Sequence, residues 1–196
     1  MSFARADEIF ATIDVLPVPT VPADAVINWR KAVHSKVIGL TPEEPSTRTS
    51  TEHALFDELA AMELEETAYL RQGEDLIAQI TLRNRLGKRA NVHLLLYGYK
   101  RGSDFATLPK LHINITPFGN VHVFDDRKRV KEEDVKVISI GNHFIVRVPL
   151  RLLGDEAPDL LFTATRANLG EVAADDTAWH LFSLSNESGI GHTIGR

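Results

Sequence analysis

The chain of 196 residues contains no cysteine. This absence excludes disulfide bonds, zinc sites built on thiolates, iron–sulfur clusters and cysteine nucleophiles. It fits a reducing compartment without requiring one.

Long apolar runs are also missing. No run approaches the ~20 apolar residues that a membrane helix needs. The N-terminus, Met-Ser-Phe-Ala-Arg-Ala-Asp-Glu, has no apolar core of the kind found in signal peptides. We therefore expect no membrane partner and, if the chain is complete, a cytoplasmic protein.

Positive charge is in deficit. Lys and Arg number 22 against 27 Asp and Glu, which gives a net charge of −5. The densest basic run, Arg127-Lys128-Arg129, is followed by Glu132-Glu133-Asp134, and no aromatic residues are interleaved with it. A nucleic-acid surface needs clustered positive charge, so we predict no nucleic-acid partner. The 43% of hydrophobic residues is typical of a globular protein with a well-buried core.

Proline marks the first 50 residues. Five prolines interrupt any regular element there, at Pro17, Pro19, Pro22, Pro42 and Pro45. We expect residues 1–50 to pack as an irregular segment on a main domain at 51–184, with a flexible tail at 185–196. Within the first segment we predict a short helix or turn around Trp29, at 24–33, and a strand at 36–40.

A helix is predicted near residues 50–62. Thr49 and Glu52 have the spacing of a capping box, and Leu55, Leu59 and Met62 follow at helical intervals. Residues 63–70 either extend this helix or form the first arm of a hairpin that turns at Gln72-Gly73. We favour the hairpin because residues 75–83 alternate between apolar and mixed positions.

Strands dominate the rest of the chain. Residues 76, 78, 80 and 82 form one apolar face, whereas 90–99 is apolar on both faces, as a central strand would be. The connections are short and rich in Gly and Asn. The pattern predicts a mainly β fold, an antiparallel β-sandwich of about eight to ten strands with one short helix. The further strands are expected at 111–116, 121–124, 135–140, 144–150, 160–166 and 177–184.

One hairpin, at 111–126, gathers polar residues. A three-residue loop, Phe118-Gly119-Asn120, would pair Thr116 with His122, Asn114 with Phe124 and His112 with Asp126. Because paired residues share a face, one face would carry His112, Asn114, Thr116, His122 and Asp126. In this register the two histidines are about 13 Å apart at ~3.3 Å per residue, too far for one ion. We predict a solvated face or a face that binds a sugar or a partner, and no metal site.

Aromatic residues are the candidate stacking groups for a sugar ring. The residues considered are Trp29 and Trp179, with Tyr69, Tyr97 and Tyr99. The ordinary alternative for each is core packing, because a tryptophan buries a large apolar area. The acidic pairs, such as Asp125-Asp126 and Asp175-Asp176, are read as solvated turns.

Catalytic motifs are lacking. The sequence has no Gly-x-Ser-x-Gly elbow, no Walker loop, no Gly-x-Gly-x-x-Gly and no His-Glu-x-x-His. We therefore assign no catalytic residue and no cofactor.

Three stretches near the C-terminus have a residue pattern similar to that of a known module. They are 144–154 (Phe-Ile-Val-Arg-Val-Pro-Leu-Arg-Leu-Leu-Gly), 158–166 and 176–182, the last with Trp179. Together they resemble the closing strands of β-sandwiches similar to family 9 carbohydrate-binding modules. They look especially like the C-terminal accessory domain of some bacterial PIG-L/LmbE-like deacetylases. The resemblance covers about residues 135–184, and the His-Pro-Asp-Asp zinc motif of those enzymes is missing, so it implies an accessory module.

The sequence thus favours a non-catalytic binding or accessory module with carbohydrate as its ligand. The residues expected to contact that ligand are Trp29, Tyr97, Tyr99, Trp179, His112, Asn114, His122 and Asp126. Two alternatives stay open. The chain could be a structural or oligomer-forming protein that uses edge strands or the proline-rich arm, or a hydrolase that uses carboxylates with His112 or His122 in a cleft.

Overall fold

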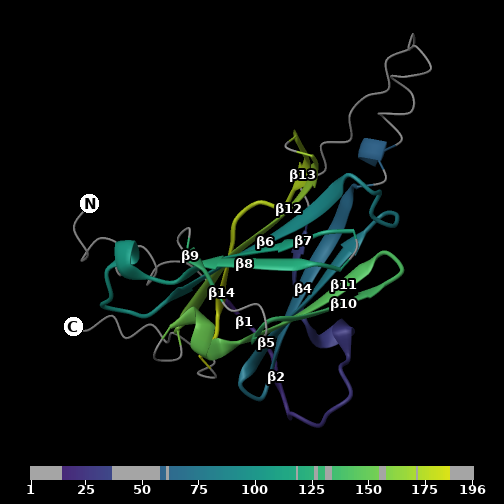
Figure 1. Ribbon diagram of the computed structural model, residues 1–196. Helices are drawn as coiled ribbons and strands as arrows, with labels where there is room; N and C mark the ends of the chain where they lie inside the picture. The colour runs from purple at the N-terminus through teal and green to yellow at the C-terminus, as the bar shows by residue number, and fades with distance from the viewer. Residues whose placement is uncertain are drawn as a thin grey trace.

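The protein is a sandwich of two β-sheets (Figure 1). The computed structural model describes residues 15–36, 58–60, 62–117, 119–125, 128–130, 134–154, 158–170 and 172–185. Both sheets are mixed but largely antiparallel, which confirms the predicted fold class. Residues 58–60 are helical, inside the predicted helix, whose residues 50–57 lie outside the described part. No helix among the described residues combines the length and the apolar character needed to cross a membrane.

The first sheet has eight strands. Its centre is the antiparallel pair β6 (Ala90–Tyr99) and β12 (Leu160–Leu169), which are in register over all ten residues of each. The central position predicted for residues 90–99 is therefore confirmed. From one edge to the other the order is β1 (Leu16–Pro17), β14 (His180–Ser183), β12, β6, β7 (Lys110–Ile115), β8 (Val121–Asp125) and β9 (Lys128–Arg129), with β13 (Val172–Asp176) also beside β12.

The second sheet has six strands. The hairpin of β4 (Leu64–Gln72) and β5 (Asp75–Leu82) forms its middle and turns at Gly73, whose φ of 59° suits glycine. The hairpin alternative for residues 63–70 is thus confirmed. The order is β10 (Lys136–Ile140), β11 (His143–Pro149), β5, β4 and β2 (Thr20–Val21), with β3 (Val33–Lys36) also beside β4.

The proline-marked segment contributes to both sheets. β1 pairs with β14, whereas β2 and β3 pair with β4. Trp29 begins a 3-10 turn, η1 (Trp29–Lys31), as expected for a short helix or turn at 24–33. The strand predicted at 36–40 lies earlier, at Val33–Lys36, and residues 37–40 are outside the described part.

The core lies between the sheets and follows the alternation in the sequence. Leu76, Ile80 and Leu82 of β5 are 0% exposed and pack with Val92, Leu94 and Leu96 of β6. Each such side chain stabilises the fold by about 1.5–3 kcal/mol relative to an exposed position. Leu111, Ile113 and Ile115 of β7 also point into this core and are 0–1% exposed.

Polar groups also bridge the sheets inside the core. The Tyr69 hydroxyl of β4 lies 2.7 Å from the Thr163 hydroxyl of β12. Two residues further along each strand, on the same face, the hydroxyls of Thr67 and Thr165 lie 2.8 Å apart. Both pairs are buried, so each hydroxyl satisfies the other where water has no access.

Two local expectations were wrong. The β7–β8 hairpin pairs Ile115 with Val121 and Asn114 with His122, a register two residues away from the predicted one. Pro117 cannot donate a ladder hydrogen bond, and the connection spans residues 116–120, closed by a 2.9 Å bond from the Thr116 N–H to the Asn120 carbonyl. The pair Asp175-Asp176, expected in a turn, lies in β13.

Candidate functional site

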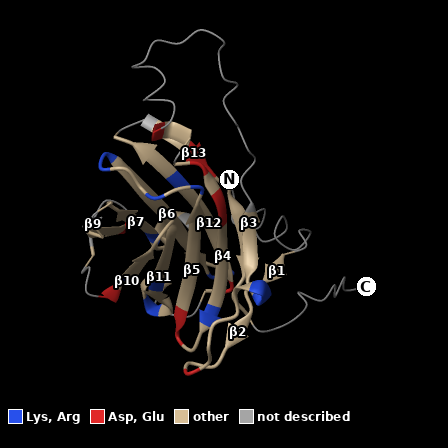
Figure 2. Ribbon diagram, turned by 90° about the vertical axis from the view of Figure 1, so that its right-hand side faces the viewer, with Lys and Arg blue, Asp and Glu red and all other residues tan. Residues whose placement is uncertain are grey.

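The side of β6 that faces away from the core carries the candidate site. Its inward residues Val92, Leu94 and Leu96 are 0% exposed, whereas the alternate residues between them are half-buried. Strands β12 and β7 flank β6 in both views (Figures 1 and 2), and paired residues share a face. We call this surface the outer face. It comprises Asn91, His93, Leu95, Tyr97, His112, Asn114, His122, Phe124, Phe162, Ala164, Arg166 and Asn168.

An aromatic pair stands at one end of the outer face. Trp179, just before β14, is 52% exposed, and its ring centre lies 5.0 Å from that of Tyr97 at an angle of 45°. Tyr97 in turn lies opposite Phe162 on β12. A tryptophan ring that packs against a tyrosine ring on one side presents a rigid apolar surface to solvent on the other.

A pair of histidines lies further along the same face. The Nδ1 atom of His93 is 2.6 Å from the Nε2 atom of His112, and the ring centres are 4.8 Å apart. Burial, together with the neighbouring His112 and Arg166, lowers the pKa of His93 to about 4. Burial and Arg166 also lower the pKa of His112. Both rings are therefore neutral near pH 7, and one N–H donates to the lone pair of the other ring.

The neutral histidine pair has a mixed hydrogen-bonding character. One proton is shared between the two inner nitrogens, so of the two outer nitrogens one is a donor and the other an acceptor. No bond from the outer nitrogens to another described residue is present. Arg166 lies opposite His93 on β12, and the carboxylate of Asp176 lies 3.7 Å from the Arg166 guanidinium.

Four polar atoms of this surface lack partners. The side-chain oxygens of Asn91, Asn114 and Asn168 on the outer face, and of Thr116 directly after β7, are buried and make no hydrogen bond to any described residue. Asn91 and Asn168 are directly paired, and Asn114 lies opposite His93. Buried polar atoms in native proteins are nearly always satisfied, so these four atoms have hydrogen-bonding capacity that the described residues do not use.

Five of the eight residues predicted from the sequence share this region. Tyr97, His112, Asn114 and His122 lie on the outer face, and Trp179 packs on Tyr97. Because the register is shifted, Asn114 rather than Thr116 lies opposite His122. His112 and His122 are therefore separated by one same-face pair along the ladder, rather than by two as predicted.

The other three predicted residues lie elsewhere. Tyr99 is 1% exposed, because Leu108 of the β6–β7 connection and the partly buried Phe162 cover its ring; it cannot stack on a ligand. Trp29 is half-buried in η1, next to the six-stranded sheet. Asp126 lies outside the described residues.

Sequence reasoning missed His93, Arg166, Asn91 and Asn168. The signal was available in β6, where Asn91, His93 and Tyr97 alternate with the core residues. Treating residues 90–99 as apolar on both faces concealed that period of two. The contribution of β12 could not be read locally, because it depends on a pairing across some 70 residues of chain.

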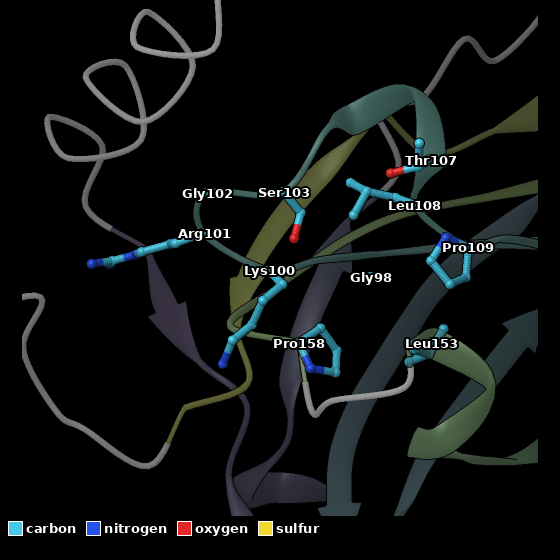
Figure 3. Close-up of a pocket in the computed structure, with 11 residues that line it drawn as sticks. Gly98, Lys100, Arg101, Gly102, Ser103, Thr107, Leu108, Pro109, Leu153 and Pro158 are labelled. Carbon is cyan, nitrogen blue, oxygen red and sulfur yellow. The ribbon is translucent and has the colours of Figure 1, made fainter.

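Two cavities of the described surface lie away from the outer face. One of about 430 Å³ opens at the end of the sandwich between the β6–β7 connection and the 3-10 turn η4 (Leu150–Leu153). Figure 3 shows Ser103 directed toward it and Arg101 directed away. A second, of about 360 Å³, lies beside the β5–β6 turn with Arg85 and Lys88 in its wall.

Acidic residues gather at β13 and at the start of β4 (Figure 2). The Asp175 carboxylate accepts hydrogen bonds of 2.9 Å from the backbone N–H groups of Leu64 and Asp176. Burial raises the pKa of Asp175, against the effect of these two bonds. Across the described residues, no three His, Asp or Glu side chains come together in a group that could hold a metal ion.

No model of a protein family matches the chain, and a comparison with curated proteins finds no significant match.

Proposed function

We propose that this chain is a non-catalytic binding module and that its ligand is a carbohydrate. The proposal depends chiefly on Trp179, which is 52% exposed although tryptophan is ordinarily well buried. Its ring is held against Tyr97, so stacking a ligand on it would cost little side-chain entropy. The carbon-bound hydrogens of a sugar ring form an apolar face that suits such a platform.

The hydrogen-bonding groups beside the platform also suit a sugar. A hydroxyl group both donates and accepts, and the neutral His93–His112 pair offers one donor and one acceptor. At ~3.3 Å per residue, Tyr97 and His93 are about 13 Å apart along β6. A short oligosaccharide could therefore stack at one point and hydrogen bond at the other.

The resemblance to family 9 carbohydrate-binding modules supports the same class. The three stretches that carry it form β11 with η4, β12, and the segment from Asp176 through Trp179 into β14. Pro149 ends β11, and Trp179 is the exposed ring of the outer face. On this basis we infer an accessory module of the kind attached to some bacterial PIG-L/LmbE-like deacetylases.

A panel of polysaccharides tests the proposal. Native affinity electrophoresis in gels containing xylan, mannan, soluble cellulose, starch or glycol chitin should retard the protein in at least one gel. Trp179→Ala should abolish that retardation. The matched control is Trp29→Ala, the same change at the six-stranded sheet, which should leave it intact. Retardation in no gel, or equal loss in the two variants, would refute the proposal.

Fluorescence gives an independent readout. The chain has two tryptophans, so Trp29→Phe leaves Trp179 as the sole reporter. Titration of this variant with oligosaccharides of the retarding polymer should shift the Trp179 emission toward the blue, because a stacked sugar displaces water from the ring. An emission spectrum unchanged at saturation would contradict stacking.

One observation favours a second candidate function, association of two copies of the chain. Ile138 and Ile140 are each 57% exposed on β10, which is an edge strand of the six-stranded sheet. An antiparallel β10–β10 contact centred on Ile138 would place Lys136 opposite Ile140 of the second copy, without opposed like charges. Light scattering should then show a dimer that Ile138→Lys dissociates; a monomer at high concentration would refute it.

A further inference from the structure

We infer that the ligand is a linear oligosaccharide bound lengthwise along β6, from Trp179 to the amides of Asn91 and Asn168. The inference extends the proposed function, on which it depends. It rests on the spatial order of three groups on the outer face: the aromatic pair, the histidine pair and the unpartnered amides.

The three groups lie in sequence along one strand. Tyr97, His93 and Asn91 are on the same side of β6, with Leu95 between the first two. At ~3.3 Å per residue, Asn91 and Tyr97 are about 20 Å apart. The three groups lie on β6 and on its neighbours β12 and β7, which flank it at roughly 4.8 Å on either side. A strip of groups about 20 Å long suits a chain better than a single ring.

The far end of the strip has hydrogen-bonding capacity that the described residues leave unused. The side-chain oxygens of Asn91, Asn168, Asn114 and Thr116 are buried without a partner among the described residues. Each such atom costs roughly 1–3 kcal/mol when nothing bonds to it. A half-turn of an amide exchanges its oxygen and nitrogen, so the asparagines can either accept from or donate to a ligand.

The charges of the strip favour a neutral ligand. Arg166 and Asp176 lie 3.7 Å apart at its side and offset each other. Lys110 of β7, opposite Tyr97, adds one positive charge at the aromatic end, and neutral histidines and amides supply the polar groups from His93 to Asn91. A single lysine offers little attraction to a polyanion such as a uronic acid polymer.

The opposite end of β6 is closed, which sets the direction of the strip. Tyr99 is covered by Leu108 and packs edge-on against Phe162, with ring centres 6.4 Å apart. A chain stacked on Trp179 therefore has room to extend toward His93 and Asn91 but not past Tyr99. The amides would contact only a ligand long enough to reach them.

Calorimetric titration with a length series tests this inference. The probes are cello-, manno- and xylo-oligosaccharides from the monosaccharide to the hexasaccharide. Affinity should keep rising beyond the disaccharide. Asn91→Ala and Asn168→Ala should each weaken binding of the hexasaccharide about tenfold, the loss of one hydrogen bond, and leave the disaccharide unaffected. Trp179→Ala should weaken both.

A second measurement avoids substitution at the amides. In ¹⁵N-labelled protein, the hexasaccharide should shift the side-chain amide resonances of Asn91 and Asn168, and the disaccharide should not. Affinity that stops rising at the disaccharide, or amides indifferent to the hexasaccharide, would overturn the lengthwise mode and leave the carbohydrate proposal standing. Binding of no oligosaccharide would overturn both.

Discussion

His93 and His112 share a single proton across 2.6 Å between neighbouring strands β6 and β7. Two protonated imidazoles could not keep this contact, because each inner nitrogen would then be a donor. Burial, the second ring and Arg166 all disfavour charge on His93. The contact and the lowered pKa values thus agree, and the pair is neutral near pH 7.

Acid should therefore destabilise the protein through this pair. The pKa of His93 is about 4 in the folded chain and 6.5 ordinarily. Between these values the unfolded chain binds more protons, so stability falls as the pH drops from about 6.5 to 4. His93→Gln should flatten this part of a plot of Tm against pH, whereas His122→Gln, on the same face but outside the pair, should not. Equal slopes in His93→Gln and the unaltered protein would contradict the assignment.

Alternation along the chain was sufficient to predict most strands. In β5 and β7 the apolar residues recur with a period of two, and burying them leaves no other orientation. The hairpin at Gly73 was predictable because only a few residue types suit its positive φ. Local chemistry therefore gave the elements and their inward faces.

Contacts between distant segments were beyond the sequence. The partners of β6 come from residues 110–115 and 160–169, and only their registers bring Arg166 and Asn114 beside His93. The burial of Tyr99 depends on Leu108 folding back over it. Asp175 was predicted to lie in a turn. Its carboxylate accepts a hydrogen bond from the backbone N–H of Leu64 in the other sheet, and the residues around Asp175 in the sequence do not indicate this contact.

The hydroxyl pair between the sheets should be strongly coupled. Tyr69 and Thr163 are both 0% exposed, and their oxygens are 2.7 Å apart. Tyr69→Phe leaves the Thr163 hydroxyl buried without its partner and should cost about 1–3 kcal/mol of unfolding free energy. Thr163→Val should lower the unfolding free energy much less in the Tyr69→Phe variant than in the unaltered protein. Urea denaturation of the double-mutant cycle measures this coupling, and strict additivity would argue against it.

Asp175 should stabilise the protein more than its neighbour does. Its carboxylate ties β13 of one sheet to Leu64 of the other, so Asp175→Ala should lower the unfolding free energy by about 1–3 kcal/mol. Asp176 is exposed and pairs with Arg166 at 3.7 Å; Asp176→Ala should cost about 0–1 kcal/mol. Chemical denaturation of the two variants at pH 7 gives the comparison. A larger loss in Asp176→Ala would contradict the assigned role.

Gly98 should tolerate no side chain. A Cβ atom built there would lie 2.1 Å from the backbone oxygen of Leu153 in η4, and a backbone carbonyl cannot rotate out of the way as a side chain can. Gly98→Ala must therefore push η4 away from β6, at a cost of about 1–3 kcal/mol or more. The matched control is Gly87→Ala, where nothing lies within 4 Å; it should change stability by less than about 0.5 kcal/mol. Thermal and urea unfolding of both variants check this, and equal stability would mean that η4 does not approach β6 so closely.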